Sequence, residues 1–405
     1  MAVAWLEDVR STDLGTVGGK AASLGELTEA GLPVPPGFVV TAGTYRTFIE
    51  EAGIDEELFS AVDVDSEDSE ALEAAHERAH ELIVETEVPE SVRAEIVEAY
   101  RSMGDGETFV AVRSSATAED LPDASFAGQQ ETFLNVTEDD LVDRVQECWA
   151  SLFSQRAIYY RNQKGFPHDE VDIAVVVQTM VDAEKSGVMF TSHPSTGDPR
   201  IIVEAAWGLG EAVVAGAVSP DNYVVDRTTG EVETMTVATK KVMHVKDDET
   251  GETVEREVPA DKREQQVLTQ AEIDRLIELG KRVEDHYGEP QDVEWAVAGG
   301  EVYMLQSRPI TTIDDGTSDA ADETDEDDGG DDHLLSGLGA SPGVVSGAVR
   351  IVTKLDHLDQ VSDGDVIVTE MTMPDMVPAM KRAAAIVTDE GGMTSHAAIV
   401  SRELG

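Results

Sequence analysis

One acidic segment near the carboxyl end limits what this chain can fold into. Residues 313–333, IDDGTSDAADETDEDDGGDDH, combine many like charges with no periodic apolar residues. Because like charges repel and a segment without an apolar face cannot bury a core, we predict an extended, disordered tether. The chain should therefore have a large body over residues 1–312 and a small body over residues 334–405, each with a core of its own.

Composition narrows the class of protein. The 405 residues are 41% hydrophobic, which is enough for two or three folded domains. The 83 acidic and 29 basic residues give a net charge of -54, which disfavours binding to nucleic acid or to an anionic membrane. A disordered acidic protein would lack the regular apolar segments seen here. We therefore predict a halophilic protein, adapted to high salt, where screening shortens the range of repulsion.

The cysteine content and the absence of long apolar segments indicate the cellular compartment of the protein. Cys148 is the one cysteine, so an internal disulfide is excluded, and its apolar neighbours predict a thiol inside a helix core. The opening residues do not resemble a signal peptide, and no stretch has about 20 uninterrupted apolar residues. These features predict a cytoplasmic protein.

The last informative segment surrounds a histidine. Residues 391–402, GGMTSHAAIVSR, place Gly392 and Thr394 just before His396, and the small residues after it predict the start of a helix. A neutral imidazole can attack phosphorus through its lone pair, and helix N-terminal amides stabilise the resulting phosphohistidine. The alternative is a buried, hydrogen-bonded histidine at a loop–helix junction.

A glycine-rich segment near the amino end carries a lysine. Residues 13–31, DLGTVGGKAASLGELTEAG, predict a loop followed by a helix, with Lys20 at the junction. Leu14 and Ala21 occupy positions where a Walker A motif needs glycine and Ser or Thr, so we exclude that motif. Lys20 can still bind nucleotide phosphates as a point charge, and the alternative is a surface lysine.

A second phosphate-binding candidate lies in residues 109–136. A strand over 109–112 should deliver Arg113 into a loop of small residues, where its guanidinium could clamp phosphate. Gly128 would let the backbone close over an anion, with Thr132 on the next strand. An ordinary surface loop is the alternative. Farther along the chain, Gln178 should lie at a strand edge whose backbone could offer hydrogen bonds to an adenine ring.

A predicted hairpin carries candidate magnesium ligands. Two apolar-rich strands flank the turn at Gly299 and Gly300. Alternation places Asp292 and Glu294 on one face of the first strand, and Gln306 and Arg308 on one face of the second. Carboxylate and amide oxygens can hold Mg²⁺, while the guanidinium can neutralise phosphate. Ordinary cross-strand pairing is the alternative.

Together these segments resemble the phosphoenolpyruvate-utilising enzymes, and among them the phosphoenolpyruvate synthases. Residues 391–402 fit the phosphohistidine motif of that family at every position, and residues 5–312 resemble its nucleotide-binding domain. The resemblance implies an α/β (α+β) fold. An ATP-grasp-like domain over residues 1–312 would precede a small swivelling β/β/α phosphohistidine domain over 334–405, incomplete at its carboxyl end.

The resemblance also implies roles for individual residues, with ATP as substrate and Mg²⁺ as cofactor. His396 would be the phosphate acceptor, supported by Gly392 and Thr394. The other assignments are Lys20, Arg113 and Arg308 on phosphate, Gly128 and Thr132 in the phosphate loop, Gln178 beside adenine, Glu294 and Gln306 on magnesium, and Asp292 close by.

The implied reaction is transfer from ATP to His396, and then to pyruvate, giving phosphoenolpyruvate, AMP and phosphate, as in gluconeogenesis. The pyruvate-binding barrel of the family is absent from this sequence, so a missing segment or a companion chain would supply it. A homodimer is compatible with the sequence. The alternatives are a truncated or split-gene phosphocarrier or regulatory module, or another family member such as pyruvate phosphate dikinase or rifampicin phosphotransferase. The segment LPDASFAGQQETF and the order of the domains favour the synthases.

Overall fold

In the computed structural model the chain forms two compact units. The first comprises residues 1–181, 246–253 and 303–307, and the second comprises residues 182–245, 254–302 and 308–405. The structure describes residues 2–65, 68–104, 108–117, 120–121, 124–125, 131–194, 196–214, 216–247, 250–310, 337, 339–341, 343–373, 376–393 and 395–404. The predicted tether, residues 313–333, lies outside the described residues, and the domain boundaries stay a prediction.

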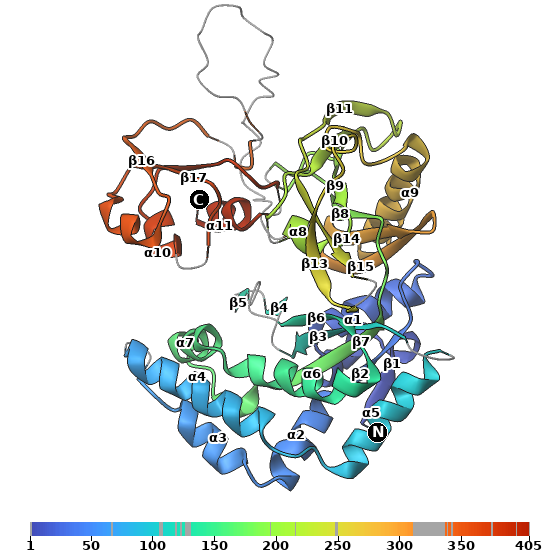
Figure 1. Ribbon diagram of the computed structural model, residues 1–405, viewed down its shortest axis with the longest axis vertical. Helices are drawn as coiled ribbons and strands as arrows, with labels where there is room; N and C mark the ends of the chain where they lie inside the picture. Colours follow the sequence, from blue (N-terminus) through green and yellow to red (C-terminus); the bar gives the residue numbers. More distant parts are fainter. Residues whose placement is uncertain are drawn as a thin grey trace, which may run out of the picture. The chain divides into compact units, whose positions relative to one another are not determined.

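The first unit is built on a five-stranded antiparallel sheet (Figure 1). Its order is β1 (Val3–Trp5), β2 (Gly37–Val40), β7 (Ile173–Thr179), β3 (Val110–Ala116) and β6 (Thr132–Val136). The sequence predicted a strand over residues 109–112 that would end before Arg113. That prediction was wrong, because β3 continues to Ala116 in register with β7.

Both faces of this sheet are buried, because successive residues of its central strands face opposite sides. Val39, Ala174 and Val176 pack against α1 (Leu14–Glu29) in one cluster, while Phe38 and Val175 belong to a larger cluster on the other face. That larger cluster also includes residues of α2 (Ala42–Glu51), α3 (Asp55–Val62), α4 (Ser69–Val84), α5 (Glu90–Ser102), α6 (Glu138–Ala150) and α7 (Gln155–Lys164).

The predicted helix-core thiol is confirmed, since Cys148 on α6 is fully buried.

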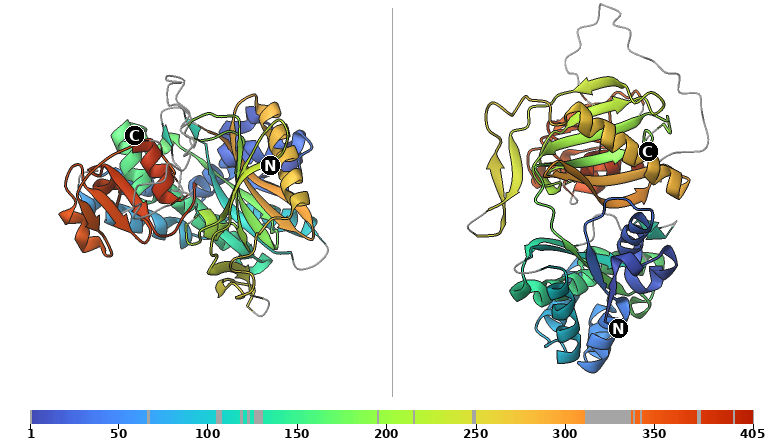
Figure 2. Two further views of the ribbon diagram at one scale, coloured as in Figure 1. Left: turned by 90° about the horizontal axis from the view of Figure 1, so that it is seen from above. Right: turned by 90° about the vertical axis from the view of Figure 1, so that its right-hand side faces the viewer.

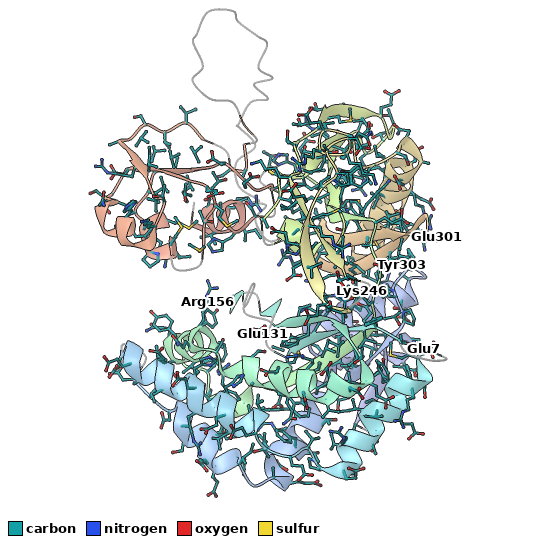
Figure 3. All side chains as sticks on the ribbon, viewed as in Figure 1. Glu7, Glu131, Arg156, Lys246, Glu301 and Tyr303 are labelled. Atoms are coloured by element: carbon teal, nitrogen blue, oxygen red, sulfur yellow. The ribbon has the colours of Figure 1, made fainter. Side chains whose placement is uncertain are left out.

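Two segments distant in sequence complete the first unit, and Lys246 and Tyr303 on them are labelled in Figure 3. The segment 303–307 is held there by backbone contacts, with Met304 N–H donating to the Pro33 carbonyl at 2.8 Å. The Lys246 ammonium lies 4.5 Å from the centre of the Phe109 ring, a favourable cation–π distance.

The second unit contains most of a six-stranded sheet, which is covered on one face by a long helix (Figure 2). Its order is β11 (Val232–Thr236), β10 (Asp221–Val225), β9 (Ile201–Trp207), β8 (Lys185–Phe190), β14 (Gln291–Ala298) and β15 (Glu301–Pro309). Helix α9 (Gln270–Tyr287) begins at a capping box formed by Thr269 and Glu272 and ends at Gly288, which has a positive φ of 74°.

The predicted hairpin is confirmed. Gly299 and Gly300 join β14 to β15 with φ values of 58° and 81°, and such positive values at both positions are those that a tight type I′ turn requires. Both residues are glycines because other side chains rarely adopt this backbone conformation.

The second unit also includes a three-stranded parallel sheet. Its strands are β16 (Val349–Ile351), β17 (Val366–Thr369) and β18 (Ala385–Thr388), and it carries the short helix α10 (Val377–Met380) and the last helix, α11 (His396–Leu404). Ile367, Met376 and Met380 are buried together at its core. The mixed α+β class predicted from sequence is confirmed. Among the described residues, none of the helices combines the length and apolar character that a membrane crossing requires.

Gly187 on β8 should not tolerate a side chain. An added Cβ would lie 1.8 Å from the Glu204 carbonyl oxygen on the neighbouring strand and 2.8 Å from the Trp295 ring. Overpacking of this kind costs about 1–3 kcal/mol. We therefore expect Gly187→Ala to lower the free energy of unfolding by at least that amount, measured by urea denaturation. Gly43→Ala is the control, because its Cβ would meet nothing nearer than 3.8 Å. Equal stability of the two variants would contradict this packing.

Candidate functional site

His396 is the first residue of α11, as the sequence predicted. The preceding residue, Ser395, caps the helix, because its hydroxyl accepts a hydrogen bond from the Ala398 N–H at 3.3 Å. The His396 side chain is half-buried, and its Nε2 atom is itself buried. Amides at the start of a helix favour negative charge, so this position suits an imidazole that becomes phosphorylated. Thr394 lies outside the described residues.

A threonine that the sequence analysis did not identify contacts the imidazole. The Thr372 hydroxyl lies 2.7 Å from Nδ1 of His396. If that hydroxyl accepts the Nδ1 proton, the lone pair of the neutral ring is at Nε2. The contact therefore holds the ring in one orientation, and in that tautomer the free lone pair is at Nε2.

The loop before His396 is anchored by a buried carboxylate, also missed from the sequence. Glu204 on β9 is fully buried, and its Oε1 accepts a hydrogen bond from the Met393 N–H at 2.6 Å. Gly392 runs so close that an added Cβ would lie 2.4 Å from that same oxygen. A larger residue at this position would therefore collide with the carboxylate. The supporting role of Gly392 stays a prediction.

Lys20 is buried in the first unit, so the surface-lysine alternative is wrong. Helix α1 begins earlier than predicted and is interrupted at Gly18, where φ is 76° and an added Cβ would lie 2.2 Å from the Ser115 carbonyl oxygen. Lys20 therefore follows a break within the helix, and its Nζ donates to the Ser114 carbonyl at 3.0 Å. The glycine segment packs directly on β3.

Arg113 and Gln306, predicted for phosphate and magnesium respectively, lie together in the first unit. Two nitrogens of the Arg113 guanidinium donate at 2.8 Å, one to the Leu305 carbonyl and one to Oε1 of Gln306. The planar fork is thereby fixed in orientation. Thr132 is exposed and pairs in register with Arg113.

The backbone around the predicted phosphate loop is partly described. The Glu131 carbonyl, on the residue labelled in Figure 3, accepts hydrogen bonds from Ser114 N–H at 3.0 Å and from the Ser114 hydroxyl at 3.2 Å. These contacts tie the end of the loop to β3. Gly128 lies outside the described residues.

The expectation that Gln178 lies at a strand edge was wrong. Strand β7 is in the middle of its sheet, between β2 and β3, so its backbone is already paired on both sides. The backbone N–H groups of Thr179 and Met180 donate to Pro36 and Phe109. The Gln178 amide is buried and donates to the Pro35 carbonyl at 3.1 Å, which fixes the turn before β2.

Asp292 and Arg308 form an ion pair in the second unit, with Nε of Arg308 2.8 Å from Oδ2 of Asp292. Burial raises the pKa of Asp292, and the neighbouring Arg308 guanidinium opposes that rise. Glu294, two residues along the same strand, is half-buried and faces the same side of the sheet. Within the described part of the chain, no group of three or more His, Cys, Asp or Glu side chains is arranged to hold a metal ion.

Comparisons with known proteins match nearly the whole chain. Residues 14–329 match the family model for the pyruvate phosphate dikinase AMP/ATP-binding domain, and residues 361–405 match the mobile domain of PEP-utilising enzymes. Alignment over 100% of this chain gives 53% identity to a probable phosphoenolpyruvate synthase of Methanothermobacter thermautotrophicus and 56% to that of Archaeoglobus fulgidus. The identity to the phosphoenolpyruvate synthase of Pyrococcus furiosus is 46%, again over 100% of this chain.

This chain spans only part of those relatives, covering 59%, 54% and 55% of their lengths respectively. Among solved structures, D-alanine–D-alanine ligase from Helicobacter pylori aligns at 12% identity over 55% of this chain and 47% of that one. Its TM-score of 0.24 is too low to support an argument about the fold.

Removing the Thr372 hydroxyl should change which nitrogen of His396 carries the proton. A neutral hydrogen bond contributes about 0.5–1.5 kcal/mol, so Thr372→Val, which keeps the side-chain shape, should shift the tautomer ratio roughly two- to tenfold. Nitrogen-15 NMR of the labelled imidazole measures that ratio. Thr388→Val on β18 of the same small sheet is the matched control. An unchanged ratio in Thr372→Val would remove this residue from the site.

Proposed function

This chain belongs to the family of the pyruvate phosphate dikinase AMP/ATP-binding domain, and we propose that it uses ATP to phosphorylate its own His396. The observation that carries this proposal is the geometry of that side chain. The ring is half-buried at the amino end of α11, and a threonine hydroxyl contacts Nδ1 at 2.7 Å. An oriented imidazole beside helix N-terminal amides is suited to attack phosphorus through its lone pair and then to bear the negative charge.

The reaction we propose begins at the β-phosphorus of ATP, by analogy with the family. A bond forms between an imidazole nitrogen and the β-phosphorus, while the bond from that phosphorus to the bridging oxygen breaks and AMP leaves. Hydrolysis of the terminal phosphate then gives inorganic phosphate and phosphohistidine. The neutral ring needs no separate base to generate its nucleophile.

The nucleotide would bind through basic and polar side chains. We propose that Lys20, Arg113 and Arg308 contact the phosphates, with Gly128 and Thr132 in the phosphate loop and Gln178 toward adenine. Two features support this: the fixed fork of Arg113 and the buried ammonium of Lys20. Asp292 would hold Arg308 in place, as its 2.8 Å ion pair indicates.

A magnesium ion would bind through oxygen ligands. Glu294 offers a half-buried carboxylate and Gln306 an amide oxygen, and hard oxygen ligands of this kind suit Mg²⁺. We propose that these two residues bind it. When bound, the ion would neutralise charge on the phosphates of ATP.

We further propose that phosphohistidine passes its phosphate to pyruvate, forming phosphoenolpyruvate in the direction of gluconeogenesis. The names of the relatives support this acceptor. The pyruvate site would lie on a separate barrel domain, reached by swivelling of the domain over residues 334–405 away from an ATP-grasp-like domain over residues 1–312. The lone buried Cys148 supports a cytoplasmic location, and the charge of -54 supports adaptation to high salt.

The acceptor is tested with ATP carrying label on its β-phosphorus, incubated with magnesium and the chain. His396→Ala should retain no acid-labile, base-stable label, because the nucleophile is gone. His357→Ala is the matched control in the same small fold and should label as the unmodified chain does. Label kept by His396→Ala would show that another residue accepts the phosphate.

If Glu294 binds magnesium, its negative charge is needed for the uptake of label from ATP. Glu294→Gln keeps the side-chain size but removes the negative charge, and we expect labelling to fall by roughly 100-fold or more. Glu301→Gln is the control, on the exposed end of β15 labelled in Figure 3, and should label normally. Circular dichroism checks that both variants fold. Normal labelling in a folded Glu294→Gln protein would remove Glu294 from the site.

A further inference from the structure

One face of the six-stranded sheet carries a row of side chains at the same register. Glu204 on β9 is paired with Val188 on β8, and Val188 with Glu294 on β14. Residues aligned in this way point to the same side of a sheet, and neighbouring strands lie about 4.8 Å apart, so the backbones at Glu204 and Glu294 are roughly 10 Å apart. Met189 faces the opposite side, toward Gly280 of α9. The two carboxylates therefore share the face that α9 leaves uncovered.

The segment before His396 covers part of this shared face. Met393 is buried against Val188, Phe190 and Ile202. Its backbone N–H also donates to the carboxylate of Glu204 at 2.6 Å. Apolar packing and one charge-assisted hydrogen bond thus hold the segment three residues before the histidine.

A second set of contacts flanks the first. The Glu390 carboxylate lies 2.6 Å from Nζ of Lys241 and 2.9 Å from the Ser219 hydroxyl. Ser395 approaches Gly216, where an added Cβ would lie 3.3 Å from the serine Cβ. Contacts at residues 390, 393 and 395 determine where the backbone at His396 lies, because the chain has little freedom over so short a span.

Glu204 is an unusual residue for the interior of a strand. A fully buried charge is costly unless it is hydrogen-bonded, and one such bond here comes from a backbone distant in sequence. If the loop moves away, the carboxylate loses this partner. Glu204 therefore favours the arrangement in which the histidine loop rests on the sheet.

We propose that Glu204 is a positioning residue for the ATP-dependent step, holding the loop of His396 on the sheet face that carries Glu294. This inference rests on the proposed function, and it adds a residue that neither contacts ATP nor takes up phosphate. It acts through the backbone of Met393.

The test compares Glu204→Ala with Glu204→Gln in the full chain. Three quantities are measured: the rate of β-label uptake from ATP, the Kd for ATP, and the hydrogen-exchange rate of the Met393 amide. We expect Glu204→Ala to slow labelling about tenfold or more and to speed exchange, with the Kd for ATP changed less than twofold, since a charge-assisted bond is lost. Glu204→Gln keeps an acceptor oxygen and should restore most of the rate. Glu233→Gln, exposed on β11 of the same sheet, is the matched control.

A second variant tests the contact between Glu204 and the histidine loop by a change in the loop. It tests the proposal even if Glu204→Ala fails to fold. Gly392→Ala places a methyl group against the Glu204 carboxylate without altering the six-stranded sheet. It should likewise slow labelling and speed Met393 exchange while leaving ATP binding intact. Normal labelling and exchange in either folded variant would overturn the proposal.

The failure of this inference is distinguishable from failure of the proposed function. An unmodified chain that takes up no label would contradict phosphorylation of His396. A chain that labels normally, together with a Glu204→Ala variant that labels equally fast, would contradict only the positioning role.

Discussion

The hydrogen bond between the buried Glu204 carboxylate and the Met393 backbone joins the two sheets of the second unit. It is possible only because Gly392 has no side chain, so the loop can approach the strand. On the other side of the loop, Arg402 of α11 donates to the Met393 carbonyl at 2.8 Å. Both polar groups of one peptide segment are thus satisfied, one by the large sheet and one by the small helix. The position of the histidine follows from this arrangement.

Local patterns in the sequence predicted those parts of the structure that neighbouring residues determine. The turn at Gly299 and Gly300 and the helix beginning at His396 were predicted because glycine pairs and a capping serine act on adjacent backbone. The burial of Lys20 was left open, since it depends on β3, some 94 positions away. The predicted edge position of Gln178 failed for the same reason, because local sequence does not state which strands flank a given strand.

Glu204 and Thr372 escaped the sequence analysis because their partners are 189 and 24 residues away. A signal for the first was available: a lone acidic residue interrupts the apolar strand IIVEAAW, where a charge needs a specific partner. Nothing comparable distinguishes Thr372 from other threonines in turns. The predictions for Gly128, Thr394 and the acidic tether fall outside the described residues, so they stay predictions.

Two of the contacts that hold the histidine loop respond differently to dissolved ions. The pair between Lys241 and Glu390 involves a mostly exposed ammonium, so mobile counter-ions weaken it within a Debye length. Kosmotropic anions such as sulfate strengthen the burial of Met393, because they are excluded from apolar surface. A rise in salt concentration therefore loosens the contact at Glu390, while a kosmotropic salt also tightens the contact at Met393.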